Sequence, residues 1–102
     1  YYTWDYLYNL GRAYLETGLV DEAIAALEKA RDRNENAIPV RISLTVAYVR
    51  AGRLEDAEWE VEQIQILNPA ETVTHTRQSY PLLDKQQKER FLDDLRKAGL
   101  PE

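Results

Sequence analysis

The stretch LGRAYLETGLVDEAIAALEKARDRNEN at residues 10–36 predicts the fold. Much of its pattern recurs 34 positions later, at residues 44–70, which read LTVAYVRAGRLEDAEWEVEQIQILNPA. A period of about 34 residues is typical of stacked helical arrays, whose units bury their apolar faces only against neighbouring units. The sequence therefore predicts an all-α array. The identical positions are Leu10, Ala13, Tyr14, Gly18, Ala23, Glu28 and Asn34, which recur as Leu44, Ala47, Tyr48, Gly52, Ala57, Glu62 and Asn68.

Apolar spacing and turn residues predict five helices of ordinary length and a short one. Gly18 and Gly52 stand where a left-handed C-terminal cap ends a helix, and Asp21 and Asp84 are suited to an N-cap. Pro39 fits the first turn of the third helix. The expected helices span about 4–17, 21–34, 39–52, 54–67, 72–79 and 85–98.

The chain resembles the tetratricopeptide repeat family at the spacings of both units. In the first unit the family's signature falls on Leu10, Gly11, Tyr14, Gly18, Ala23, Leu27 and Ala30, and in the second on Leu44, Tyr48, Gly52, Ala57, Val61, Ile64 and Pro69. Small residues such as Gly11 let two helices approach closely, and Tyr14 fills the gap between them. Thr45 departs from the pattern at the place of Gly11, as Glu35 does at the place of Pro69. The resemblance implies an α-α superhelix of helical hairpins that binds other proteins.

The same offset, applied again, exposes a decayed third unit. Leu95 and Ala98 correspond to Val61 and Ile64, so the last helix lies in the register of the second helix of a unit, whereas Pro81 breaks the helix before it. We expect a single domain over 1–102, with repeats at 4–37 and 38–71 and a degenerate C-terminal capping unit at 72–102.

The tail at 96–102 also resembles the closing segment of bacterial multi-repeat signalling proteins, including those that carry a nucleotide cyclase. That resemblance implies the C-terminal regulatory or assembly end of a longer protein. The sequence contains no methionine and begins at Tyr1, which we interpret as a sign of such a larger context.

Composition excludes several classes of function. With 102 residues, a net charge of −5 and no cysteine, the sequence is that of a small folded domain without disulfide or thiolate chemistry. Its acidity disfavours nucleic acid as a partner, and its apolar runs are too short for a membrane span. We expect a cytoplasmic protein that needs no cofactor.

Candidate catalytic groups are sparse. His75 is the single histidine, and Ser43 and Ser79 lack the context of an activated nucleophile. The carboxylates at 55–62 and 93–94, Glu60 and Asp94 among them, are predicted to face solvent because consecutive helical positions radiate around the axis. We therefore expect a non-catalytic protein without a metal site.

The resemblance places the first helix of each unit on the concave side of the array, where residues off the packing stripe are the candidate partner contacts. Aliphatic side chains exposed together usually mark a contact site. A partner peptide or helix, a second copy of the chain or an upstream segment would cover them; alternatively, they pack against the third unit. The candidates are Tyr8, Arg12, Leu15, Glu16, Ile42, Val46, Val49 and Arg50.

Some members of the family clamp the C-terminal carboxylate of chaperone peptides with lysine and asparagine. The matching places here hold Tyr8, Arg12, Pro39 and Ser43, so we do not expect that ligand. Arg12 and Arg50 remain suited to an acidic group on another ligand.

A second apolar surface is predicted on the fourth helix, where Trp59 and Ile66 lie off the packing stripe. We expect Tyr80, Leu82 and Leu83 to fold over it, with a second chain as the alternative.

The aromatic N-terminus is a further candidate surface. Tyr1 and Trp4 suit either an assembly contact or packing against an upstream repeat. The sequence as a whole favours a protein interaction module, with homo-oligomerisation as the alternative.

Overall fold

The computed structural model describes residues 2–80 and 84–102, and this part of the chain is a stack of helices. The expected helices are all present, and each end lies within two residues of its expected place. They are α1 (Trp4–Glu16), α2 (Val20–Arg33), α3 (Ile38–Arg50), α4 (Leu54–Leu67), α5 (Val73–Ser79) and α6 (Lys85–Lys97).

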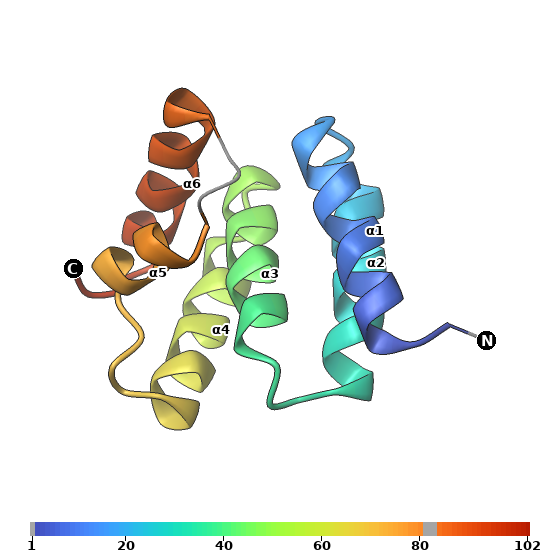
Figure 1. Cartoon of the computed structure of the whole chain (residues 1–102), viewed down its shortest axis with the longest axis horizontal. Helices are drawn as coiled ribbons and strands as arrows, with labels where there is room; N and C mark the ends of the chain where they lie inside the picture. Colours follow the sequence, from blue (N-terminus) through green and yellow to red (C-terminus); the bar gives the residue numbers. More distant parts are fainter. Residues whose placement is uncertain (1, 81–83) are drawn as a thin grey trace.

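The first four helices form two hairpins that stack side by side. α1 pairs with α2, α3 pairs with α4, and α2 packs against α3, so that α3 lies in the middle of the molecule (Figure 1). Every residue from 40 to 48 on α3 is buried. This complete burial follows from a helix that has neighbours on three sides, namely α2, α4 and α6.

Glycines set the turns and the closest helix approach, as the sequence predicts. Gly18, Gly52 and Gly99 follow α1, α3 and α6 with φ angles of 83°, 77° and 99°, a region that side chains disfavour. Gly11 faces Leu27 so closely that a Cβ built on it would lie 2.5 Å from the Leu27 Cγ. Helices α1 and α2 can therefore pack at this distance only with glycine here.

Side-chain caps explain where three helices begin. Thr3, Thr72 and Asp84 each accept a hydrogen bond from a backbone N–H in the first turn of α1, α5 and α6. The expectation that Asp21 caps the second helix is wrong. α2 begins at Val20, and its N-cap is Leu19, two residues before Asp21. Asp21 lies within the first turn, where its negative charge interacts favourably with the helix dipole.

The third unit folds back onto the centre of the molecule. α6, rather than the seven-residue α5, packs against α3. The C-terminal tail holds α5 in place, because the N–H groups of Val73 and Thr74 donate to the carbonyl oxygens of Pro101 and Glu102 at 2.8 and 3.2 Å. Leu100 is buried beneath this contact. Within the described residues, none of the helices combines the length and the apolar character that crossing a bilayer requires.

Candidate functional site

The aliphatic residues predicted to line the concave face are mostly covered by the chain itself. Leu15, Ile42 and Val46 are buried in the same core cluster as Phe91 and Leu92 of α6. The expectation that they form an exposed apolar surface is therefore wrong. The alternative of packing against the third unit describes α3, which carries Ile42 and Val46 and packs against α6, whereas Leu15 lies on α1, which packs against α2 and α3 rather than α6. The other candidates stay accessible in part or whole: Tyr8, Arg12, Val49 and Arg50 are partly buried and Glu16 is exposed.

Tyr80 completes this cover from the segment after α5. Its ring lies 5.2 Å from that of Phe91, and its hydroxyl lies 3.4 Å from the Tyr8 hydroxyl. The expectation that Tyr80 covers Trp59 and Ile66 on α4 is therefore wrong, since Tyr80 contacts Tyr8 of α1 and Phe91 of α6 instead and both α4 residues stay exposed. Leu82 and Leu83 lie outside the described residues.

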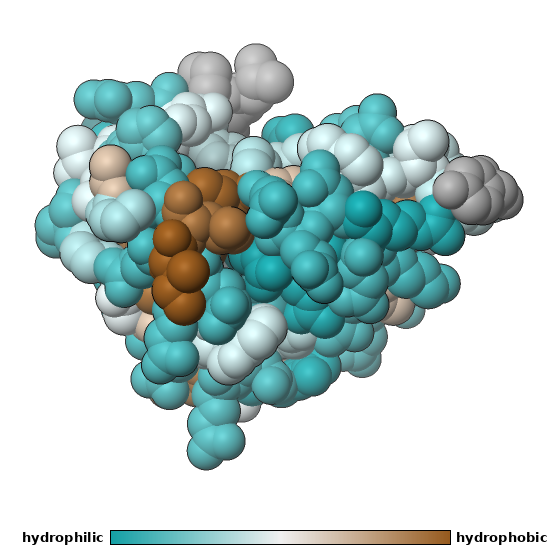
Figure 2. Space-filling model, turned by 90° about the horizontal axis from the view of Figure 1, so that it is seen from below, coloured by the Kyte–Doolittle hydropathy of each residue, from teal (hydrophilic) through white to brown (hydrophobic). Residues whose placement is uncertain are grey.

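The surface of α4 consequently keeps an apolar patch. Ile66 is 73% exposed and Trp59 49%, although the Arg41 guanidinium lies 5.8 Å from the Trp59 ring centroid. Figure 2 shows the molecule from the side on which α4 ends, with an apolar patch in a largely hydrophilic surface. At the N-terminus, Trp4 is half-buried against Leu7 of its own unit, and Tyr1 lies outside the described residues.

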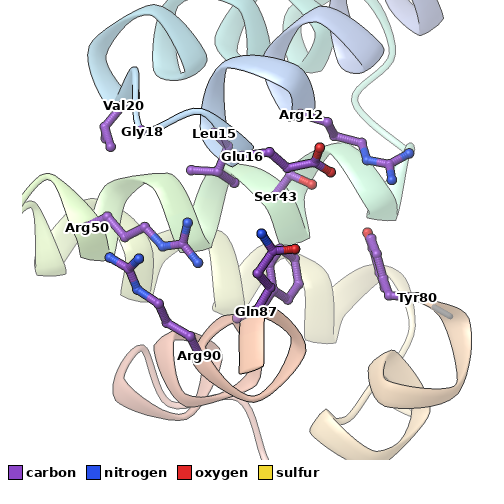
Figure 3. Close-up of a pocket in the computed structure, with 11 residues that line it drawn as sticks. Arg12, Leu15, Glu16, Gly18, Val20, Ser43, Arg50, Tyr80, Gln87 and Arg90 are labelled. Carbon is purple, nitrogen blue, oxygen red and sulfur yellow. The ribbon is translucent and has the colours of Figure 1, made fainter. Parts of the chain in front are cut away.

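A pocket of about 250 Å³ remains where α1, α3 and α6 meet, and we call it the α1–α3–α6 pocket. Side chains from all three helices and from Tyr80 point into it (Figure 3). Its lining residues are Arg12, Leu15, Glu16, Gly18, Val20, Ser43, Arg50, Tyr80, Gln87, Arg90 and Phe91.

The lining of the pocket is positively charged although the whole chain carries −5. Three arginines face a single carboxylate, that of Glu16. In the view of Figure 3, Arg50 and Arg90 are drawn on one side of the pocket and Arg12 on the other. The Arg50 Nε donates to Asp94 at 2.8 Å, which ties α3 to α6. Arg12 and Arg90 form no ion pair with any carboxylate in the described part of the chain.

A buried hydroxyl without an ordinary hydrogen bond lies at the same pocket. Ser43 is 1% exposed, and its Oγ makes no hydrogen bond of ordinary geometry with the described residues, although it lies near the Tyr80 hydroxyl. A buried polar group left unpaired costs free energy, so natural structures rarely keep one without a reason. Ser43 is one of the residues that line the pocket, so this hydroxyl lies close to where an incoming group would bind.

Removing this hydroxyl should make the free protein more stable. We expect Ser43→Ala to raise the free energy of unfolding by about 1 kcal/mol, because the unpaired polar group disappears and alanine favours the helix. Urea denaturation followed by circular dichroism measures the change. A loss of stability would show that Ser43 Oγ already has a partner in the folded protein.

Burial against Phe91 changes the acidity of Tyr80. It raises the pKa of the phenol well above its ordinary value, and the Tyr8 hydroxyl adds to the rise, whereas the nearby Ser43 hydroxyl and Arg12 oppose it. A raised pKa in the folded state means that folding favours the neutral phenol. Its contribution to stability is therefore complete below about pH 10 and is lost as the pH rises further.

Alkaline titration tests this consequence. We expect the free energy of unfolding to fall between about pH 9 and pH 12, and to fall less steeply in Tyr80→Phe, which has no phenol to ionise at this position. Parallel urea denaturation series on the two proteins measure the difference. Equal slopes would contradict the burial of the Tyr80 hydroxyl.

A buried ion-pair network was not predicted from the sequence. Glu60 is fully buried on α4 and accepts from Arg31 Nη1 at 2.6 Å and from Arg41 Nη1 at 2.8 Å. Asp94 is also buried, beside Arg50. The expectation of a solvated carboxylate face is therefore wrong for Glu60 and Asp94, while Glu55 is exposed as expected. The network supports the fold and lies away from the pocket lining.

The described residues hold no cluster of histidine and carboxylate side chains suited to a metal ion. His75 lies on the surface, where its Nδ1 is 2.7 Å from the Oε2 of the buried Glu71. Its role in the structure is a contact at the start of α5.

Comparison with known families agrees with the repeat pattern. A family model described as a tetratricopeptide repeat matches residues 14–73, which run from the last turn of α1 to the start of α5. Among curated proteins, no sequence matches the chain significantly.

Proposed function

We propose that this chain, which belongs to the tetratricopeptide repeat family, binds a segment of a partner protein in its α1–α3–α6 pocket. The family is generally one of non-catalytic protein interaction modules. The observation that carries the proposal is the pocket itself: although α6 packs against α3, apolar side chains and several polar groups still converge where α1, α3 and α6 meet.

The size and lining of the pocket favour one or two side chains of a polypeptide. Its volume of about 250 Å³ lies below the usual range for pockets that bind small molecules, roughly 300–1,000 Å³. Leu15, Val20 and Phe91 supply apolar contact, while Tyr80 and Gln87 supply hydrogen-bonding groups. The lack of cysteine suits a reducing compartment, so we place this interaction in the cytoplasm.

A blocking substitution tests the proposal. Peptides are first selected on the wild-type protein from a random twelve-residue library, and their affinities are then measured by fluorescence polarisation. We expect Gln87→Trp, which places a ring at the pocket, to weaken binding about tenfold or more, because each 1.4 kcal/mol of lost contact is tenfold in affinity. Lys85→Trp adds the same ring to an exposed position of α6 outside the pocket lining and should leave affinity unchanged.

Two outcomes would refute the pocket as the binding site. One is equal binding by the two tryptophan variants and the wild type. The other is a library from which the wild-type protein selects no peptide.

A second candidate function is self-association through α4. The observation that favours it is the exposure of Ile66 at 73%, close to Leu67 and seven positions from Trp59. If a second copy covers this patch, sedimentation at tens of micromolar should show a dimer, and Ile66→Lys should return it to a monomer. Ile66 is exposed in the single chain, so this substitution should not disturb the fold. A monomer at all concentrations would exclude this candidate.

A further inference from the structure

We infer that the α1–α3–α6 pocket selects partner segments that present an Asp or Glu side chain beside an apolar residue. This inference rests on the proposed function and names the chemistry of the partner. It follows from three features of the pocket: its arginines, its unpaired hydroxyl and its apolar floor.

The arginines make the pocket a site for a carboxylate. Guanidinium groups bind carboxylates through paired, charge-assisted hydrogen bonds. Arg90 has no carboxylate partner in the described part of the chain, and it lines the pocket together with Arg50 and Arg12 (Figure 3). Arg50 donates its Nε–H to Asp94, and its other N–H groups remain donors in the pocket lining. A ligand carboxylate would give Arg90 the counter-charge that it lacks among the described residues.

The buried Ser43 hydroxyl provides the independent sign of a ligand. Ser43 is 1% exposed, its Oγ makes no hydrogen bond of ordinary geometry with the described residues, and it lines the same pocket as the arginines. A hydroxyl can donate to a carboxylate oxygen. Binding of an acidic side chain would therefore satisfy the buried group that the free protein leaves unpaired.

The apolar floor sets the second part of the specificity. Leu15 and Phe91 belong to the core, and together with Val20 they supply the apolar part of the pocket lining, which we call the apolar floor. If the partner contributed only an acidic residue, these apolar side chains of the pocket would stay exposed to water. An apolar residue next to it in the partner would cover the floor while the carboxylate reaches the arginines.

Glu16 favours a side-chain carboxylate over the terminal carboxylate of a chain. It is exposed and lies in the pocket on the same helix as Arg12. Its oxygens can accept from the backbone N–H groups of a peptide that continues through the pocket, whereas they repel a second, terminal carboxylate. The partner segment is therefore expected to run on beyond the acidic residue.

Charge reversal tests the inference. The random twelve-residue library is displayed with its C-terminal ends joined to a carrier protein, so that the ligand carboxylates come from side chains. It is selected on three proteins: the wild type, Arg90→Glu, and Lys85→Glu as a control with the same charge change outside the pocket. We expect peptides with an acidic residue next to an apolar one from the wild type and from Lys85→Glu, and loss of the acidic residue with Arg90→Glu.

Single substitutions in a selected peptide give the size of the effect. Glu→Gln or Asp→Asn in the peptide should weaken binding to the wild type about tenfold, because hydrogen bonds to charged groups are the strong ones. Ser43→Ala should weaken binding of the same peptide severalfold while leaving the protein folded.

The inference would be overturned if the wild type selected no acidic residues, or if Arg90→Glu selected the same acidic peptides. Acidic enrichment only from a library with free C-terminal ends would likewise overturn it in favour of a terminal carboxylate. Neutral peptides whose binding Gln87→Trp abolishes would refute the acidic preference and leave the proposed function standing. Loss of pocket-dependent binding altogether would refute both.

Discussion

Replacing Glu60 by glutamine should lower the free energy of unfolding by about 3–5 kcal/mol, the usual result of removing one partner from a buried ion pair. Glu60 is fully buried and bonds both Arg31 and Arg41. The substitution leaves Arg41 without its carboxylate partner and leaves Arg31 paired with the exposed Asp32 at 3.3 Å. Arg41 has little freedom to move into solvent, because its Nε also donates to the Glu35 carbonyl oxygen at 3.0 Å. A domain of this size has little stability to spare. Guanidinium denaturation followed at 222 nm measures the loss.

Glu62→Gln is the matched control, because it makes the same chemical change on an exposed position of α4. It should alter stability by less than about 0.5 kcal/mol. Replacing the pair together, as Glu60→Leu with Arg41→Met, should recover most of the loss, since apolar residues of similar volume commonly substitute well for a buried ion pair. If Glu60→Gln were as stable as Glu62→Gln, the buried network would not contribute to the fold.

Placing threonine at Gly11 should cost about 2 kcal/mol, the middle of the range for overpacking a core. A Cβ at this position would lie 2.5 Å from Leu27 Cγ and 2.7 Å from Leu27 Cδ2, and Leu27 is fully buried. Either the two helices must separate or Leu27 must leave its position. Thermal or urea denaturation gives the change.

The second repeat supplies the rescue for this substitution. Its equivalent positions hold Thr45 and Val61, which are both buried, so a larger residue on the first helix accompanies a smaller one on the second. Gly11→Thr with Leu27→Val copies this pair into the first repeat and should regain much of the lost stability. Ala13→Thr, at an exposed position of α1, controls for the helix propensity of threonine. An unchanged stability in Gly11→Thr would contradict the close approach of α1 and α2.

The repeat pattern was sufficient to predict the helices, the turn glycines and the two hairpins. These features depend on contacts within one unit or between adjacent units, which the 34-residue period displays directly. Gly18 and Gly52, for example, take their positive φ angles from the same turn in each hairpin.

The buried charges were missed although the period contained a signal for them. Glu60 occupies the position of Ala26, and Asp94 lies 34 residues further on; all three are buried. Arg41 likewise stands at the position of Leu7, a core residue of the first unit. We predicted that Glu60 and Asp94 face solvent because their side chains are charged. Equivalence to apolar positions would have indicated burial, and with it the need for ionic partners.

The candidate pocket could be predicted only in part. Arg12, Glu16 and Arg50 follow from the helix faces of the first two units, and all three line it. Tyr80, Gln87 and Arg90 could not be found this way, because the third unit has lost the pattern and packs α6 against α3. The 34-residue repeat cannot predict the contacts of a helix whose sequence no longer follows the repeat.

Chemical-shift mapping of a selected peptide on the ¹⁵N-labelled protein tests the central claim most directly. The peptide is titrated and the backbone amide signals are followed residue by residue. We expect the largest shifts on Gly18, Ser43, Gln87 and Arg90, which come from three different segments and all line the pocket. Shifts concentrated on α4 around Trp59 and Ile66, with the pocket signals unmoved, would contradict that claim.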